Sequence, residues 1–194
     1  MDGNAVVGIA DSGAFCDDNV QVRENSKQHT KYIEGIGHVL IGISGTFSIL
    51  QWIVTIDWPP CEIEDSNYAS LLQRYFIMDL QPFLKKSVFK RFKKHSTPKP
   101  EEDETMDWTL LVGVPSCGIF TLYANGDVEK AWDPNHGMAH ACIGSGGVVA
   151  DACIKTLKVT STLRSWEMLD YAASAAFQSI SSVRGPFTTK YLMA

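Results

Sequence analysis

The sequence lacks the features that mark membrane and secreted proteins. No apolar run approaches the roughly 20 residues of a membrane-spanning helix. The N-terminus has no basic stretch followed by an apolar core, which a secretory signal requires. The 5 cysteines are odd in number, widely spaced and form no CxxC pair. These absences predict a cytoplasmic protein, without membrane attachment, whose thiols are reduced and mostly buried.

The sequence also lacks a positive net charge and internal repeats. Its net charge of -5 gives no general reason to expect a nucleic-acid partner. No period of the solenoid type is found. What is present is a globular composition, with 45% hydrophobic and 20% charged residues. Because 194 residues can bury a complete core, we predict a single domain over residues 1–194.

One basic segment departs from this acidic balance. "KKSVFKRFKK" at 85–94 interleaves lysines and an arginine with the apolar residues Val88, Phe89 and Phe92. Such a segment is compatible with nucleic acid or with an acidic protein partner. However, an acidic run at 101–104 offsets its charge. We therefore favour a solvated helix end that its apolar residues anchor to the core.

In the first half of the chain, segments that predict strands are followed by segments that predict helices. "NAVVGIADSG" and "HVLIGISG" are rich in β-branched residues and glycines, and they predict strands before residue 50. From 66 to about 94 the apolar residues recur at helical spacing. Pro82 is expected to break or kink that helix. "STPKPEEDET" at 96–105 is typical of a solvated loop.

Strands resume in the second half and then alternate with helices. "WTLLVGV" and "GIFTLYANGDVEKAW" predict strands, the second folded at the hairpin dipeptide Asn125-Gly126. "AHACIG" is expected to be a strand that runs into "SGG" and a helix from about 148 to 157. Ser165 is expected to cap a further helix, with Glu167 in its first turn, and "PFTTKYLM" to close the chain as a strand. This order predicts a layered α+β domain with helices on sheets.

Four motifs follow one another along the chain. Asp11 ends the first strand in "IADSG", and Lys27 lies sixteen residues later. "GISGTF" at 42–47 carries a strand into small residues, and "IGSGGVVA" at 143–150 joins a strand to a helix. None of these motifs is specific by itself. In this order and at this spacing, they resemble the proteasome β-subunit and bacterial HslV family of N-terminal nucleophile (Ntn) hydrolases, over nearly the whole chain.

The resemblance implies a fold and an assembly. The family has a four-layer αββα sandwich, in which two packed antiparallel sheets carry helix pairs on their outer faces. Its members form rings, commonly stacked, that enclose a chamber. The expected partner is therefore the chain itself in a homo-oligomeric ring. If the subunit is active, its substrate would be a peptide or unfolded protein and its candidate partner an ATPase unfoldase. No cofactor and no metal are implied.

The resemblance also implies the chemistry of the site. The family uses a Thr at the free N-terminus as nucleophile, with its own α-amine as base. By the resemblance, Lys27 would lower the effective pKa of that hydroxyl, and Asp11 would hold Lys27 in place. The backbone N–H at Gly45 would stabilise the oxyanion. Ser145 would match the supporting serine of the GSG motif.

The resemblance assigns further positions to substrate binding and support. Phe15 and Phe47 fall where backbone groups of the family pair with an extended peptide substrate. The proteasomal branch also has a second supporting Asp in the segment that matches "SSVRGPFTT". This chain has Gly185 at that place, with Ser182 nearby. The resemblance therefore predicts a weaker active site here.

The nucleophile is expected to be missing, together with the first strand that would carry it. In the family the Thr stands as far before the Asp as the Lys stands after it, a position that here lies upstream of Met1. In one interpretation the strand and the nucleophile have been lost, and the subunit has no peptidase activity. The alternatives are an active threonine-type endopeptidase that begins further upstream, and a structural ring that uses the fold only for assembly.

The predicted strand at Ala5–Ala10 then needs another partner. Asp2-Gly3 is a hairpin dipeptide, so the strand that enters this turn would be one residue long. Buried backbone N–H and C=O groups without partners are costly. A strand of a neighbouring subunit or the C-terminal "PFTTKYLM" would satisfy them. Otherwise the edge stays open to an added strand.

Other candidate chemistry is weaker. Cys16 and Ser12 are the alternative nucleophiles, but neither is terminal and no histidine lies near them in the sequence. His136 and His140 are four residues apart, as helical metal ligands can be. They stand in "DPNHGMAH", whose Pro and Gly predict a loop, so we do not expect a metal site there.

Overall fold

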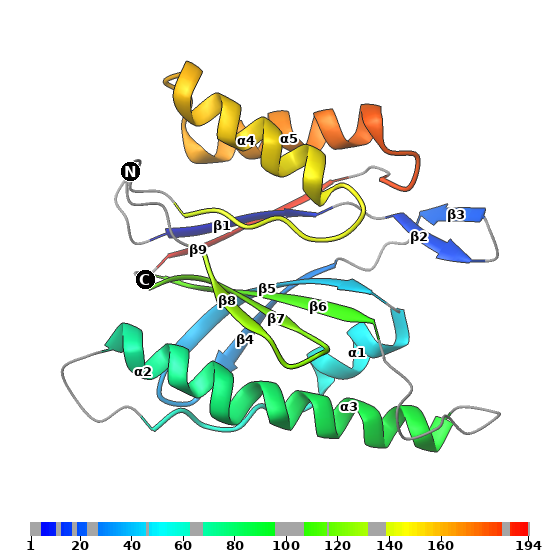
Figure 1. Ribbon diagram of the computed structural model, residues 1–194, viewed down its shortest axis with the longest axis vertical. Helices are drawn as coiled ribbons and strands as arrows, with labels where there is room; N and C mark the ends of the chain where they lie inside the picture. Colours follow the sequence, from blue (N-terminus) through cyan, green and yellow to red (C-terminus); the bar gives the residue numbers. More distant parts are fainter. Residues whose placement is uncertain are drawn as a thin grey trace.

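The computed structural model describes most of the chain, in residues 5–10, 13–16, 19–22, 27–45, 47–62, 68–95, 107–115, 117–131, 139–183 and 187–193. These residues form four layers, with two layers of strands between two layers of helices (Figure 1). The predicted α+β class with helices packed on sheets is confirmed.

The larger sheet has five antiparallel strands in the order β4-β5-β6-β7-β8. They are β4 (Gln28–Ile33), β5 (Gly37–Gly45), β6 (Trp108–Val114), β7 (Gly118–Tyr123) and β8 (Val128–Lys130). The predicted hairpin at Asn125-Gly126 joins the last two strands. There the N–H of Asp127 donates to Oδ1 of Asn125 at 3.0 Å, and Gly126 takes a φ of 115° that favours glycine.

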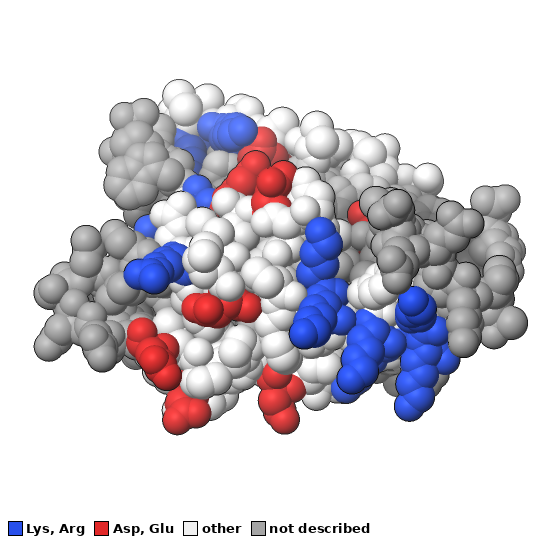
Figure 2. Space-filling model, turned by 60° about the horizontal axis from the view of Figure 1, so that its bottom comes forward, with Lys and Arg blue, Asp and Glu red and all other residues white. Residues whose placement is uncertain are grey.

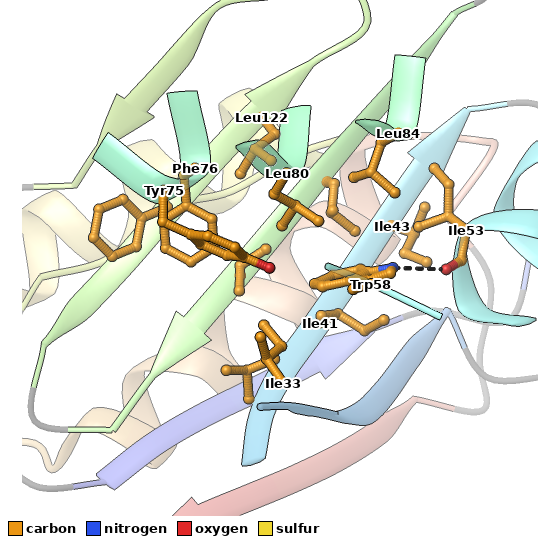
Figure 3. Close-up of a cluster of buried hydrophobic side chains, with 14 of the residues drawn as sticks. Ile33, Ile41, Ile43, Ile53, Trp58, Tyr75, Phe76, Leu80, Leu84 and Leu122 are labelled. Carbon is orange, nitrogen blue, oxygen red and sulfur yellow. Dashed lines mark hydrogen bonds between the residues drawn. The ribbon is translucent and has the colours of Figure 1, made fainter. Parts of the chain in front are cut away.

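One face of this sheet is covered by α1 (Phe47–Thr55), α2 (Tyr68–Tyr75), the π-helical turn η1 (Phe76–Leu80) and α3 (Gln81–His95). The main hydrophobic core lies between them, and Figure 3 shows Phe76, Leu80 and Leu84 directed from the helices toward the strands. Trp58 closes one side of this core, and its indole N–H donates to the carbonyl of Ile53 at 3.1 Å.

Of the two predicted effects of Pro82, a break is not found, but the helix loses its regular geometry just before this residue. The helical path continues from α2 through η1 into α3. Because Pro82 has no N–H, the usual bond to the residue four positions earlier cannot form. The turn before it adopts π geometry instead, in which the N–H of Gln81 donates to the carbonyl of Phe76.

The basic segment 85–94 lies on α3, as the favoured interpretation predicts. Val88 is fully buried, Phe89 and Phe92 are half-buried, and the lysines are exposed. In the view of Figure 2, most lysine and arginine side chains of the lower half gather on the right, and most acidic side chains lie to their left. The apolar residues therefore anchor a solvated helix.

The second strand layer is narrow. β1 (Ala5–Ala10) pairs antiparallel with β9 (Thr188–Met193), in the register Ala5 to Met193. The C-terminal strand is therefore a partner of β1, which was one of the predicted options. A separate hairpin, β2 (Gly13–Cys16) with β3 (Asn19–Val22), extends beyond the end of β1 (Figure 1).

The outer layer is the pair α4 (Gly147–Thr160) and α5 (Ser165–Ser179), which covers the β1–β9 layer (Figure 1). The predicted strand at 139–144 is wrong, since residues 139–143 have no regular structure. The predicted cap at Ser165 is also wrong by one position. Arg164 is the N-cap residue, and its N–H donates to Oε2 of Glu167 at 2.7 Å. A long side chain and a downstream carboxylate here replace the usual short hydroxyl.

Candidate functional site

A cavity of about 820 Å³ lies between the β1–β9 layer, the five-stranded sheet and the helices α4 and α5. Protein interiors are close-packed and rarely hold voids much larger than a water molecule. A volume of this size falls instead in the range of ligand sites. The cavity is therefore the main candidate for a functional site among the residues that the structure describes.

Small residues create this space while they let the layers approach. A Cβ atom at Gly113 of β6 would clash with Cγ1 of Val6, and one at Gly8 would lie 2.9 Å from Nε2 of Gln28. These two glycines therefore let β1 lie close against the sheet. On the opposite wall, the buried Ala172, Ala173 and Ala176 of α5 leave room that larger side chains would fill.

Three of the predicted catalytic positions line this one cavity. Lys27 immediately precedes β4 and is half-buried, Gly45 ends β5, and Ser145 lies just before α4. Gly45 has a φ of 126°, and a Cβ atom there would clash with the carbonyl of Asp107. Only glycine fits at this position without strain.

The polar groups gather where three chain segments converge. Oγ of Ser145 and Oγ of Ser182, which follows α5, are 2.6 Å apart and share a hydrogen bond. A Cβ atom at Gly144 would lie 3.0 Å from Oγ of Ser44, so the segment before α4 meets the end of β5. Ser44, Ser145 and Ser182 all line the cavity. We call Lys27, Ser44, Gly45, Ser145 and Ser182 the polar mouth.

Several predicted positions lie outside the described residues. These are Asp11, Ser12, His136 and Gly185. Phe15 pairs with Val20 in the β2–β3 hairpin and Phe47 begins α1, but their side chains and that of Cys16 are likewise outside the description. The predicted pairing of Asp11 with Lys27, and the substrate role of the two phenylalanines, stay predictions.

His140 makes contacts other than metal coordination. Its Nε2 lies 3.0 Å from Oδ1 of Asp151, and Nζ of Lys158 lies 2.9 Å from its Nδ1. Burial and the Lys158 ammonium lower the pKa of His140, while Asp151 acts in the opposite direction. A neutral imidazole that donates to Asp151 and accepts from Lys158 fits both contacts. Across the described ranges, no three His, Cys, Asp or Glu side chains form a metal-binding group.

The cysteines whose side chains are described are all free thiols. The four whose side chains are described form no disulfide. Cys61 is buried, whereas Cys117, Cys142 and Cys153 are half-buried, so the predicted burial holds only in part. Burial raises the pKa of Cys142 to about 11, which makes this cavity-lining thiol a poor nucleophile near neutral pH.

Sequence reasoning missed two members of this site. Ser44 lies inside the motif "GISGTF", but only its glycine was assigned a role. Asp107 precedes β6, and its place beside Gly45 follows from the β5–β6 register. That register becomes visible only when the two strands are paired.

Comparison with known proteins gives no family match from the sequence, and no curated protein is similar in sequence. Solved structures do match. BPH of Thiobacillus denitrificans has a TM-score of 0.65 at 15% identity, over 99% of this chain and 94% of that one. HslV of Trypanosoma brucei has a TM-score of 0.59 at 16% identity, over 100% and 97%.

A third match is Anbu, described as an ancestral β-subunit, from Yersinia bercovieri, with a TM-score of 0.65 at 17% identity. The alignment covers 98% of this chain and 78% of that chain. The chain has the proteasome-β-like Ntn-hydrolase fold. The predicted resemblance is thus confirmed for the fold, since identities this low carry no more than architecture.

The position of the cavity can be described in terms of the proteasome-β-like fold. In this fold the two strand layers face each other, and here the cavity between them is lined in part by the residues of the polar mouth. One Anbu, from Pseudomonas aeruginosa, has been solved as a helical assembly. None of the helices within the described ranges is both long and apolar enough to cross a bilayer.

Proposed function

We propose that these 194 residues form a proteasome-like subunit of a self-assembling ring. They would supply the supporting groups of a threonine-type peptidase site but not its nucleophile. The observation that carries this proposal is the convergence of Lys27, Gly45 and Ser145, from three separate elements, on the mouth of one cavity.

Each of these residues has a chemical role in the proposal. The Lys27 ammonium would favour ionisation of a hydroxyl placed beside it. The N–H at Gly45 would donate to the oxyanion of a tetrahedral intermediate. Ser145, which shares a hydrogen bond with Ser182 at 2.6 Å, would relay or hold the proton of the attacking group.

Within the described ranges, no histidine that could act as a general base stands beside the hydroxyls of the polar mouth. Ser145 and Ser182 are hydrogen-bonded to each other, and no histidine lines the cavity among the described residues. We therefore propose that the chain in this form does not hydrolyse peptides. The active peptidase alternative needs a Thr that precedes these residues.

The test is the turnover of fluorogenic peptides by the 194-residue chain, beside Lys27→Ala. The proposal expects the same background rate for both proteins, and no labelling by covalent inhibitors that react with threonine. Turnover that disappears in Lys27→Ala would show that a residue within this chain is the nucleophile. In that case Ser44→Ala is the next variant to measure.

Assembly is the second part of the proposal. The outer helices carry exposed apolar side chains, among them Val148 at 80% and Val159 at 75% exposure on α4. Tyr171 and Phe177 of α5 are exposed as well. These residues support contacts between subunits, and a structural ring without catalysis would use the same surface. A cytoplasmic location is proposed for the subunit in either case, whereas an ATPase unfoldase belongs to the peptidase alternative.

A further inference from the structure

The segment before α4 folds back along that helix. Residues 139–143, which we call the strap, run beneath α4 and join it through the turn at 144–146 (Figure 1). Across this turn the N–H of Gly147 donates to the carbonyl of Gly144 at 2.9 Å. The two arms touch, since a Cβ atom at Gly147 would lie 3.3 Å from the carbonyl of Cys142. The strap and α4 are therefore the two arms of one turn.

One side chain of the strap contacts α4 at two points. Nε2 of His140 lies 3.0 Å from Oδ1 of Asp151, and Nζ of Lys158 lies 2.9 Å from Nδ1 of the same ring. Asp151 and Lys158 are about two helical turns apart, so they lie on the same face of α4. The His140 side chain is 15% exposed. The imidazole thus holds the strap against the helix from both sides of its ring.

The turn between the two arms carries part of the polar mouth. Residues 141–147 line the cavity without interruption. Ser145 lies within the turn and shares its hydrogen bond with Ser182, which follows α5. A movement of the strap away from α4 therefore changes the position of Ser145 relative to Ser182.

A protonated imidazole cannot keep both contacts. The neutral ring donates from Nε2 to Asp151 and accepts at Nδ1 from Lys158. A proton on Nδ1 removes that acceptor and places a second cation beside the Lys158 ammonium. Asp151 offsets this only in part, because its other oxygen pairs with Lys155 at 2.7 Å. Among the residues that the structure describes, these three side chains of α4 are the charged groups that act on His140.

We propose that His140 is a pH-sensitive clasp on the wall of the candidate site. When it is neutral, it holds the strap on α4 and fixes the turn that carries Ser145. When it is protonated, it leaves α4 for solvent, and the turn loosens. Release hydrates the imidazolium and separates it from Lys158, so it removes both sources of the unfavourable energy.

The direction of the pH effect follows from the two states of the clasp. Burial and the Lys158 ammonium lower the pKa of His140 while the strap lies on α4. A released, hydrated imidazole has its ordinary pKa near 6.5 and binds a proton more tightly. Release therefore increases as the pH falls from 6.5, and it stops increasing below the lowered pKa.

As a regulatory device of the polar mouth, the clasp rests on the proposed function. Its test, however, measures the motion of the strap and needs no peptide hydrolysis. Failure of the clasp would leave the proposed function in place. Failure of the proposed function would leave a strap that still opens in acid.

The test is hydrogen exchange of the amides in residues 141–147 at pH 7.5 and pH 5, corrected for the intrinsic effect of pH on exchange. We expect the open fraction of this segment to rise roughly threefold or more at pH 5 in the parent protein. The amides of β6, in the main core, should change less and show that the fold is intact.

Three variants assign the effect to the clasp. His140→Gln keeps a donor for Asp151 but does not titrate, so its open fraction should be the same at both pH values. Lys158→Met removes the cation that opposes the proton, so the imidazolium pairs with Asp151 and the strap stays on α4 at pH 5. Lys86→Met, at an exposed position of α3, removes the same charge from another helix and should open like the parent.

Three results would overturn the proposal. The first is exchange in residues 141–147 that does not respond to pH in the parent. The second is the same response in His140→Gln as in the parent, and the third is the same response in Lys158→Met as in Lys86→Met. If His140→Gln does not fold, the comparison of the two lysine variants still decides.

Discussion

At the residue scale, Lys31 shows how one side chain joins a strand to a helix end. Its Nζ donates to the carbonyls of Val54 at 3.0 Å and Ile56 at 2.7 Å, at the C-terminal end of α1. Burial lowers the pKa of Lys31, while Asp57 acts to raise it. The ammonium therefore satisfies carbonyl groups that a helix end leaves without partners.

We expect Lys31→Met to lower the free energy of unfolding by about 1–3 kcal/mol, because two carbonyls lose their donor. Urea denaturation followed by circular dichroism measures this change. Lys86→Met, at an exposed position of α3, is the control and should stay within about 0.5 kcal/mol of the parent. Equal stability of Lys31→Met and the parent would show that the two hydrogen bonds of Lys31 do not stabilise the fold.

His140 makes stability depend on pH. Because its pKa in the folded protein is lowered below 6.5, the unfolded chain binds a proton first as the pH falls. The contribution of His140 is thus complete above pH 6.5 and is lost as the pH falls from there through the lowered pKa. Asp151, Lys155 and Lys158 of α4 are the charged groups that act on it.

We expect the parent to lose more stability than His140→Gln between pH 7.5 and pH 5, as measured by urea denaturation at each pH. His38→Gln, a change at an exposed histidine, should behave like the parent. If His140→Gln and the parent show parallel pH profiles, the imidazole does not titrate in this way.

At the element scale, α3 is held by one apolar stripe. Leu84 and Val88 of α3 are fully buried against the five-stranded sheet, and Leu80, the last residue of η1, continues their line at helical spacing. The basic residues between them stay in solvent. This division explains how a helix with so many lysines forms part of the main core.

Leu84→Ala should therefore lower the free energy of unfolding by about 2–5 kcal/mol, through lost burial and the cavity left behind. Lys85→Ala, the exposed neighbour, should change it by less than about 0.5 kcal/mol. Thermal and urea denaturation both measure the difference. Similar effects of the two substitutions would contradict the burial of this stripe.

Most elements follow from local patterns in the sequence, and the exceptions have physical causes. "WTLLVGV" forms β6, and "PFTTKYLM" contains β9, as their β-branched and aromatic residues predict. The segment 139–143 reads as a strand but pairs with nothing described, so composition alone cannot make it one. Pro82 predicts a break or a kink, and the structure has a π-helical turn before it through which the helix continues.

The candidate site divides in the same way. Lys27, Gly45 and Ser145 could be predicted because the resemblance fixes their order along the chain, and the structure brings them to one cavity. The cavity, and the places of Ser44 and Asp107 in its wall, could not be predicted. They depend on how the separate layers approach one another. The glycines at positions 8 and 113 are a signal for that approach, but only after the layers are known.

At the scale of the whole molecule, the proposed ring makes a direct prediction. We expect the purified protein to be larger than a dimer, as a six- or seven-membered ring or a stack of two rings. Light scattering coupled to gel filtration measures this mass. A mass of 21.4 kDa, that of one chain, across micromolar concentrations would contradict the assembly.

A paired substitution tests which surface assembles. Val148→Glu with Val159→Glu places charges on the exposed face of α4 and should dissociate the assembly if that face lies between subunits. Lys85→Glu with Lys86→Glu, on α3 at the opposite side of the molecule (Figure 1), is the matched control. Loss of assembly in the control alone would place the contact on α3.

The central claim is that Lys27, Gly45 and Ser145 are the supporting groups of a peptidase site without its own nucleophile. The most direct test extends the chain at its N-terminus by a six-residue strand that begins with a free Thr, and measures hydrolysis of fluorogenic peptides. The claim predicts activity in the extended protein, none in the 194-residue chain, and loss of that activity on Lys27→Ala or on replacing the terminal Thr by Ala. Activity in the 194-residue chain that requires Lys27, or activity in the extended protein that survives Lys27→Ala, would contradict it.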